Sequence, residues 1–411
     1  MTAARDTAKY SSHNLYLIAV VVCGCLIGTL TFGPRSAMGL FLTPMTDANG
    51  WSREIFAFSI AVQNLVWGAV QPFAGGFADR YGTWRVITFG AAIYVFGLVL
   101  MSMATDPVGL HLTAGVLVGI GIASSAFFLV LAAFARIVPE QYRGLVFGLG
   151  TAASSAGQLV FAPLGQAFID GYGYQTALLL LAMMVATVPI LAITLRGKPE
   201  VSAQPDGRSD QTIRQALAEA FSTRSYVLLV LGFFVCGYHV AFITVHLPSY
   251  IVDICGPTPL AAWSIAIIGA FNIIGAIGSG TLMSRFPKRY ILSGIYLGRV
   301  VVIMAFVLLP VTQGSIIVFS AAMGILWLST VPPTQGLVAV FFGTRYMAML
   351  FGIAFFSHQV GSFLGIWLGG VIYDATGNYD LMWWTSVAAG LFAAAAHWPI
   401  REQAVARLQP A

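Results

Sequence analysis

The residues of this chain that could do chemistry are a few cationic side chains placed inside long apolar segments. They are Arg35, His239, His246, Arg299 and His358. No Asp or Glu lies near the middle of an apolar segment, and Asp253 lies only at the end of one. An ionisable group at bilayer depth costs about 3 kcal/mol or more and is retained for pairing or function. The inventory predicts a positive site that favours an anionic substrate.

Arg35 is the first candidate for holding that anion, because a guanidinium donates charge-assisted hydrogen bonds to a carboxylate. Alignment of two internal repeats, described below, places Arg35 and His239 at equivalent points of two segments. We expect the two side chains to face each other across a pseudo-twofold axis. Alternatively, Arg35 extends towards the nearer membrane surface, since it lies late in its segment. The cost of burying a cation favours the binding role.

The three histidines each have two interpretations. His246 lies two helical turns after His239 and therefore shares its face. Each ring either contacts the substrate or donates a hydrogen bond to a carbonyl within the bundle. Imidazole exchanges a proton near neutral pH, so His358 in FFSHQVGSFLG is a candidate proton carrier where buried carboxylates are missing.

Uncharged polar side chains extend the candidate site. Asn64, Trp67 and Asn272 also lie in apolar segments and could line a cavity. Polar groups bridge helices inside membranes as well, and for each of them alone the packing role is favoured. A structural role is also favoured for Arg299, which we expect to pair with polar groups such as Asn272.

The elements that must position these groups are transmembrane helices. The chain has 411 residues, 58% hydrophobic and 9% charged, against roughly 25% charged in an average soluble domain. A spanning helix needs about 20 apolar residues. Apolar segments of this kind lie at approximately 14–42, 53–74, 85–104, 109–135, 144–169, 175–195, 226–252, 261–283, 290–310, 313–341, 348–373 and 380–400. This pattern predicts an all-α integral membrane protein with twelve transmembrane helices.

The basic residues report the orientation of these helices. The net charge is +5, but the basic side chains are scattered and form no patch for nucleic acid. With the N-terminus inside, all of them except Arg35, Arg53 and Arg299 fall in the tails or in loops on one side. This is the positive-inside rule, and it predicts a multi-pass protein of the cell membrane with both termini cytoplasmic.

A polar stretch divides the chain into two. It begins RGKPEVSAQPDGRSD, which is linker-like, and continues TIRQALAEAF, whose apolar residues recur at helical spacing. We therefore expect a six-helix bundle at 1–195, a cytoplasmic linker with an amphipathic helix at 196–224, and a second six-helix bundle at 225–411. The halves also repeat, because LGQAFIDGYGY at 164–174 matches LGGVIYDATGNY at 368–379. Such repeats indicate two pseudo-symmetric bundles around a central site.

A charged motif, GGFADRYGTWR at 75–85, follows the second apolar segment, and the second half carries a degenerate copy of it. A charge cluster at such a junction can hold two bundles in one state and release them in another. We assign this gating role to Gly75, Asp79, Arg80, Gly82, Arg85 and Arg285.

The motif resembles the loop motif of the major facilitator superfamily. The twelve segments, the central linker and the degenerate copy extend the resemblance over nearly the whole chain. The resemblance implies alternating access around a midplane cavity lined mainly by helices 1, 4, 7 and 10. The second copy has Ser284 for Asp and Pro287 for Gly, which implies a weaker second latch.

Pro34-Arg35-Ser36 is similar to the Pro-Lys-Ser stretch of the monocarboxylate transporter family. GWSREIFAFSIA and TIRQALAEAF also resemble that family and its oxalate/formate antiporter relatives, in which a lysine occupies about the place of His358. The eighth helix of these families carries an arginine, with an aspartate one turn earlier in the animal members. Ala276 and Asn272 stand at those positions here, so the usual carboxylate clamp and proton acceptor are missing.

We therefore expect a secondary transporter of a small organic anion, with a monocarboxylate as the first choice, driven by protons or by exchange. The alternative is an efflux carrier for drugs or other amphiphiles. Against it, Gly115 stands near the place where proton-driven exporters carry an arginine. Metal uptake and catalysis are disfavoured, because no suitable Met or His pair, nucleophile constellation or ATP-binding loop is present. We expect no cofactor or metal, and no partner beyond substrate, lipid and protons, so that a monomer suffices.

Overall fold

The computed structural model describes residues 2–125, 127–196, 211–256, 259–343 and 346–408, and every regular element in them is helical. The first half contains α1 (Thr2–Ser36), η1 (Met38–Phe41), α2 (Leu42–Asn49), α3 (Arg53–Tyr81), α4 (Thr83–Ser102), α5 (Pro107–Leu110), the π-helical η2 (His111–Leu117), α6 (Val118–Ser125), α7 (Phe127–Ile137), α8 (Glu140–Val185), α9 (Val188–Ala192) and η3 (Ile193–Leu195). The second half contains α10 (Ile213–Ser222), α11 (Arg224–Cys255), α12 (Leu260–Leu282), α13 (Lys288–Leu308), α14 (Gln313–Leu326), α15 (Val331–Phe342), α16 (Met347–Thr376), α17 (Asp380–His397) and η4 (Ala406–Leu408).

The described chain crosses the membrane twelve times. Ten of its helical stretches are long and apolar enough to span a bilayer. One of them, Gly148–Leu195, is 48 residues long, roughly 70 Å if straight and more than twice a hydrocarbon core of about 30 Å. Gly173 breaks it with a φ of +77°, which a glycine adopts without strain, so this stretch makes two passes. The 18-residue α17 is the remaining pass.

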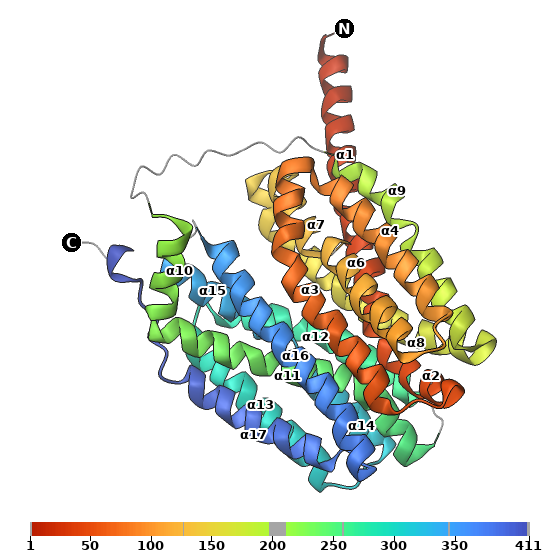
Figure 1. Ribbon diagram of the computed structural model, residues 1–411. Coiled ribbons are helices and arrows are strands. Elements are labelled where there is room, and N and C mark those ends of the chain that lie inside the picture. The colour runs from red at the N-terminus through yellow and green to blue at the C-terminus, as the bar shows by residue number, and fades with distance from the viewer. Residues whose placement is uncertain (1, 126, 197–210, 257–258, 344–345, 409–411) are drawn as a thin grey trace.

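Figure 1 shows the helices packed in two groups that follow the order of the chain. In the first half, α1 packs on α8, and α6 packs on α3 and α4. In the second half, α11 packs on α16, α12 on α14, and α13 on α17. The halves meet where α3 lies along α16 and α8 lies along α12. This arrangement places α1, α8, α11 and α16 around the middle of the molecule.

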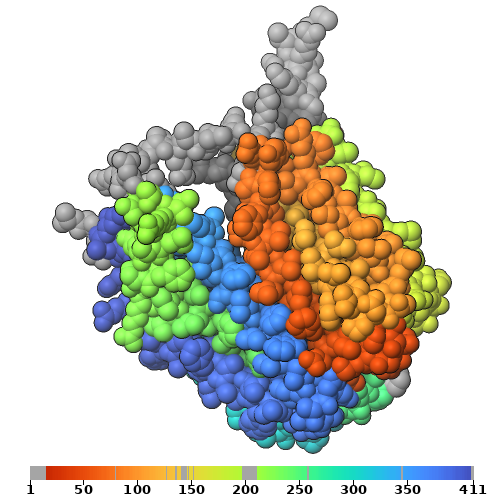
Figure 2. Space-filling view, in the orientation of Figure 1, coloured from red at the N-terminus to blue at the C-terminus, as the bar shows by residue number. Residues whose placement is uncertain are grey.

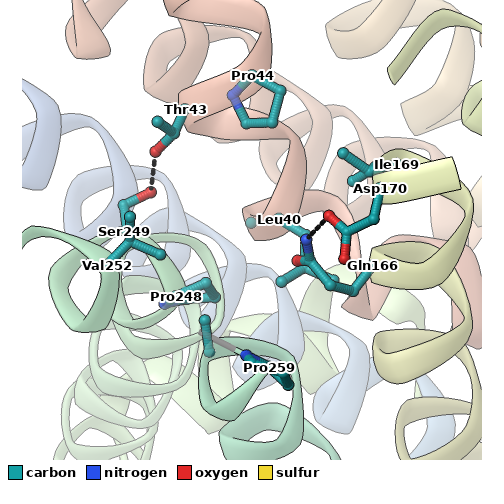
Figure 3. Close-up of a pocket in the computed structure, with 12 residues that line it drawn as sticks. Leu40, Thr43, Pro44, Gln166, Ile169, Asp170, Pro248, Ser249, Val252 and Pro259 are labelled. Carbon is teal, nitrogen blue, oxygen red and sulfur yellow. Dashed lines mark hydrogen bonds between the residues drawn. The ribbon is translucent and has the colours of Figure 1, made fainter. Parts of the chain in front are cut away.

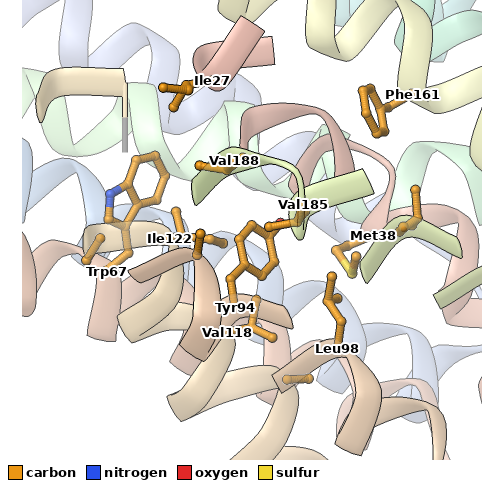
Figure 4. Close-up of a cluster of buried hydrophobic side chains, with 14 of the residues drawn as sticks. Ile27, Met38, Trp67, Tyr94, Leu98, Val118, Ile122, Phe161, Val185 and Val188 are labelled. Atoms are coloured by element: carbon orange, nitrogen blue, oxygen red, sulfur yellow. The ribbon is translucent and has the colours of Figure 1, made fainter. Parts of the chain in front are cut away.

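The interior of the first half is filled by apolar side chains. Figure 4 shows Tyr94 of α4 at the centre of this cluster, among side chains from α4, α6, α8 and α9. Its labelled neighbours include Leu98, Val118, Ile122, Val185 and Val188. Many large apolar side chains point outwards instead, such as Phe73, Phe89 and Ile190, which are more than half exposed. Lipid covers such a surface, so the distribution fits a membrane-spanning protein.

Glycines let α11 and α16 approach closely. A Cβ at Gly237 would collide with the carbonyl oxygen of His358, and a Cβ at Gly361 would collide with that of Phe234. Small residues permit this close backbone contact. In lipid the hydrophobic effect does not drive helices together, so such van der Waals packing stabilises their association instead. The pair therefore forms a rigid frame for the side chains that both helices present to the interior.

The two ends of the molecule differ. In Figure 1 the start of α1 is at the top and α10, which follows the linker, is at the left; we call this upper-left side the linker end. The opposite end carries α2 and the start of α14, and we call it the far end. The first half and the second half are in contact towards the far end in Figure 2. At the linker end, Gly75 and Gly280 both have open space beside them. The structure thus shows a conformation closed at the far end.

Candidate substrate-binding cavity

A cavity of about 250 Å³ lies between the two halves at the middle of the molecule. This is slightly below the range of small-molecule pockets, which is roughly 300–1,000 Å³. Its walls come from α1, α3, α6, α7 and α8 on one side and from α11, α12, α15 and α16 on the other. The expected helices 1, 4, 7 and 10 all contribute, together with the second, fifth, eighth and eleventh passes. Its polar lining residues are Thr31, Arg35, Ser36, Ser154, Ser155, Gln158, Thr244, Gln335 and His358.

Among the described residues that line this cavity, Arg35 alone carries a full charge, and none is acidic. Its Nη2 donates to Asn64 Oδ1 at 2.8 Å, and Asn64 Nδ2 donates to the Ile60 carbonyl at 2.8 Å. The guanidinium carbon lies 4.6 Å from the Trp67 ring centroid and 5.3 Å from that of Phe32. These contacts direct the cation into the protein, so Arg35 does not extend to the membrane surface.

The guanidinium still has bonding capacity. Arg35 Nε is buried and has no hydrogen-bond partner among the described atoms. None of the described ion pairs includes Arg35. A buried cation without a counter-charge is unfavourable unless something completes it, and an anionic ligand would do so. Ala276, at the position where related families carry an arginine, also lines the cavity and adds no second cation.

His358 of α16 lines the same cavity on the side of the second half. Its ring lies 5.0 Å from that of Phe233 and is stacked on that of Phe355 at 5.8 Å. Its Nδ1 lies 3.1 Å from Gln359 Oε1. The structure therefore brings Arg35, Trp67 and His358 to one cavity, with Asn64 directly behind the arginine.

His239 does not face Arg35, contrary to the expectation from the repeats. It is fully buried, and its Nε2 donates to the Ser386 carbonyl of α17 at 2.8 Å. The face of α11 that lines the cavity carries Val240 and Thr244 instead. The repeat gave the depth of His239 in the membrane, but α11 is rotated so that the following residue points inwards.

His246 also points away from the cavity. Its Nε2 donates to the Ile366 carbonyl at 2.8 Å, and its Nδ1 lies 3.0 Å from the hydroxyl of Tyr379. The ring nitrogen that does not donate accepts from this hydroxyl. Both histidines on α11 therefore make the carbonyl contacts that we considered as the alternative to substrate binding.

We expected Arg299 to pair with Asn272, but the two side chains do not bond to each other. Both bind a break in the tenth pass, where α14 ends at Leu326 and α15 begins at Val331. Arg299 donates to the carbonyls of Leu326 and Trp327, with Nη2 2.8 Å from the former. Asn272 Oδ1 accepts from the Leu328 amide at 3.0 Å, and Nδ2 donates to Ser155 Oγ at 2.9 Å. Asn272 thus supports the cavity wall from outside.

The gating candidates lie at the linker end. Gly82, with a φ of +92°, makes the turn between α3 and α4, and Gly75 lies about two helical turns before it. Arg80, Arg85 and Arg285 are exposed. The Arg80 guanidinium lies 5.4 Å from the Tyr81 ring centroid, and the Tyr81 carbonyl accepts from Arg85 Nη1 at 3.3 Å. The side chain of Asp79 lies outside the described residues. A gating role for these residues stays a prediction.

A network of charged and aromatic side chains closes the far end, and the sequence had not revealed it. Arg53 of α3 forms two hydrogen bonds of 2.7 Å with Asp253 of α11. It also donates to the Tyr379 hydroxyl at 3.0 Å and lies 3.8 Å from the Tyr373 ring centroid. Asp374 accepts from the Arg53 and Glu54 amides at 3.1 and 2.8 Å. We call these residues, with His246, the far-end network. The sequence held one sign of this network, because Arg53 is one of the three exceptions to the expected one-sided distribution of basic residues.

A second pocket, of about 430 Å³, opens at the far end. Figure 3 shows Thr43 and Ser249 bonded at 3.0 Å on one side of it, and Gln166 donating to Asp170 at 2.7 Å on another. It shares no lining residue with the central cavity. Asp170 is exposed, so this pocket lacks the buried, unpaired cation that marks the central cavity.

The fold and the cavity define a polytopic helical transporter, in which a site at mid-membrane lies between two halves of the chain. The model of the Major Facilitator Superfamily matches residues 24–366. The chain belongs to this superfamily, and it is a transporter and not an enzyme.

Curated relatives are transporters of similar length. An uncharacterized MFS-type transporter of Bacillus subtilis, YcxA, is 26% identical over 85% of this chain and 86% of its own. Monocarboxylate transporter 13 of Rattus norvegicus is 26% identical over 91% of this chain and 85% of its own. The agnestins efflux protein AgnL12 of Paecilomyces divaricatus is 24% identical over 79% and 73%.

Solved structures show the same fold. A D-xylose–proton symporter superposes with a TM-score of 0.73 at 16% identity, over 94% of this chain and 98% of its own. A bacterial homologue of the lysosomal transporter Spinster, in an inward-facing conformation, gives 0.71 at 15% identity over 93% and 96%. At these identities the likeness concerns the fold alone.

Proposed function

We propose that this protein is a secondary active transporter of small organic anions, with monocarboxylates as the substrate class. It works by alternating access across the cell membrane and is driven by protons or by exchange. The observation that carries the proposal is Arg35, the single charge among the described residues of the cavity lining. Asn64 and Trp67 hold it in place, and no described carboxylate neutralises it. The similarity to monocarboxylate transporters supports the same substrate class.

In this proposal the linker divides the chain into the two parts that move. Residues 1–195 and 225–411 form the two six-helix bundles that rock against each other, and 196–224 joins them. The basic residues support a cytoplasmic location for both termini and thus for the linker end. Gly75, Asp79, Arg80, Gly82, Arg85 and Arg285 then form the latch of the cytoplasmic side. Arg80, Arg85 and Arg285 are exposed, and none of the described ion pairs joins one of them to a carboxylate of the other bundle.

The central test replaces the cation. Arg35→Ala should lower uptake of a monocarboxylate into proteoliposomes about thirtyfold or more, since loss of a desolvated charge pair costs about 2–5 kcal/mol. Arg35→Lys should retain part of the activity, because it keeps the charge but loses the planar fork. Arg214→Ala on the exposed face of α10 is the matched control, and thermal unfolding in detergent reports folding. Uptake by a folded Arg35→Ala protein that equals wild type would rule out the proposal.

Efflux of amphiphilic molecules is the second candidate, and the aromatic walls of the cavity favour it. Phe32, Phe128 and Phe355 are suited to a neutral apolar ligand as much as to an acid with an apolar body. The two functions differ in their need for the cation. An efflux carrier for neutral amphiphiles would keep its transport in Arg35→Ala, and an anion carrier would lose it.

A further inference from the structure

The walls around Arg35 are unusually rich in aromatic side chains. The aromatic residues that line the cavity are Phe32, Trp67, Phe127, Phe128, Phe233, Trp327, Phe351 and Phe355. They come from α1, α3 and α7 of the first half and from α11, α16 and the α14–α15 break of the second. A small hydrophilic acid gains little from contact with aromatic rings, whereas a ligand with an aromatic body packs favourably against them.

These rings form a continuous path that leads away from the cation. The Arg35 guanidinium lies 4.6 Å from the Trp67 ring, which meets the Phe355 ring edge-on at 5.3 Å. Phe128 also meets Phe355 edge-on at 5.3 Å. Phe355 stacks on His358, which lies 5.0 Å from Phe233. The path therefore runs from the first half across the cavity to the second half.

Three polar side chains next to Arg35 already use their donor hydrogens, whereas Gln158 Nε2, on the lining of the same cavity, has no hydrogen-bond partner among the described atoms. Thr31 and Ser36 donate their hydroxyl hydrogens to the α1 carbonyls of Ile27 and Gly33 at 2.8 and 2.7 Å. Asn64 uses its oxygen for Arg35 and its nitrogen for Ile60. A hydroxyl or keto oxygen beside the carboxylate, as in lactate or pyruvate, would lose its water and find no free donor from these three side chains.

We propose that the cavity selects monocarboxylates with an aromatic or bulky apolar body over the short hydroxy and keto acids. The proposal rests on the proposed function, in which Arg35 holds the carboxylate. The carboxylate completes the guanidinium at one pole, and the body of the substrate lies among Trp67, Phe128 and Phe355. Because these rings belong to both halves, the substrate contacts both bundles at once, which is what a carrier needs if the substrate is to promote closure.

Binding to the full-length protein in detergent tests this selectivity, measured by calorimetry with three probes: phenylacetate, lactate and benzyl alcohol. We expect phenylacetate to bind at least about tenfold more tightly than lactate, because aromatic contacts add to the apolar area that is buried. Benzyl alcohol, which has the ring without the carboxylate, should bind more weakly than phenylacetate. Equal affinities for phenylacetate and lactate would overturn the substrate class but leave the anion carrier standing. Binding of benzyl alcohol that matches or exceeds both acids would overturn the anion carrier as well, and so would a lack of binding by all three.

Two variants locate the effect in the cavity. Phe355→Leu should weaken phenylacetate binding about tenfold and change lactate binding less than about twofold. Arg35→Ala should weaken both acids. Phe89→Leu, on the lipid-facing side of α4 and 64% exposed, is the matched control and should change neither. If Phe355→Leu weakens the binding of both acids equally, Phe355 makes no specific contact with the aromatic body. The comparison of the three ligands uses the wild-type protein, so it does not depend on whether either variant folds.

Discussion

Two of the cationic side chains found from the sequence, Arg35 and His358, share one cavity, while His239 and His246 lie outside it. Hydropathy gives the depth of a residue in the membrane, and the repeat pairs depths between the halves. Neither gives the rotation of a helix about its axis. A rotation of α11 by one residue, about 100°, is enough to exchange His239 for Val240 on the cavity wall.

If protons drive the proposed carrier, His358 is the candidate to carry them, because it is the one histidine among the described residues that line the cavity. We predict that His358→Gln abolishes accumulation driven by a pH gradient while exchange of anions across equal pH persists. Glutamine keeps a hydrogen-bonding side chain but cannot carry a proton, so only the coupling should be lost. Uptake into proteoliposomes with an acid exterior, compared with counterflow at one pH, measures both. His239→Gln serves as the comparison on α11, and accumulation that survives in His358→Gln would assign the proton elsewhere.

At the scale of the elements, the tenth pass was predicted as one helix over 313–341, and the structure breaks it between Leu326 and Val331. The apolar pattern continues through the break, so hydropathy alone cannot reveal it. Pro332 and Pro333 follow it and lack the amide hydrogens that a continuous helix would use. The break is possible because Arg299 and Asn272, from other helices, bond the exposed backbone groups. A structural role for Arg299 was expected from the sequence, but the backbone carbonyls that it binds could not be derived from one sequence.

We predict that Arg299→Leu destabilises the protein and spares the chemistry of the cavity. The carbonyls of Leu326 and Trp327 lose their donors in a buried setting, and each unsatisfied group costs about 1–3 kcal/mol. Arg299→Lys should recover part of the loss, since its ammonium group again offers hydrogen-bond donors, from one nitrogen instead of the guanidinium's three. Thermal unfolding in detergent measures the effect, with the exposed Arg214→Leu as control. If Arg299→Leu melts like wild type, the break does not depend on these bonds.

At the scale of the whole molecule, composition, hydropathy and the internal repeat predicted the fold. The sequence could not predict which conformation the structure shows, because a carrier that alternates between two states has the same sequence in both. The described state is closed at the far end, where the bonds of the far-end network join the halves. Asp253 and Asp374 contact Arg53 only because α11 and α16 lie against the start of α3 in this state. Acids and bases spread over three helices carry no pattern in the sequence that marks them as partners.

The far-end network should therefore set the balance between the two states. Its contacts join the two halves, so they must separate when the far end opens, and they stabilise only the closed state. The Arg53 and Asp253 side chains are 12% and 29% exposed, and pairs of this kind contribute about 1 kcal/mol or less. A change of about 1 kcal/mol alters a two-state ratio about fivefold. Arg53→Gln should shift the population towards the far-end-open state by about that factor.

Spin labels on the exposed Asp47 and Gln313, at the far end of each half, measure this shift as a change in their distance distribution. The background replaces Cys23, Cys25 and Cys255 with serine and retains the buried Cys236. Asp253→Asn should act like Arg53→Gln, and the double variant should shift the population no further than the stronger single variant, because both remove the same pair. Distance distributions that stay unchanged in Arg53→Gln would show that the helix contacts of α3 with α16 hold the far end closed without the ion pair.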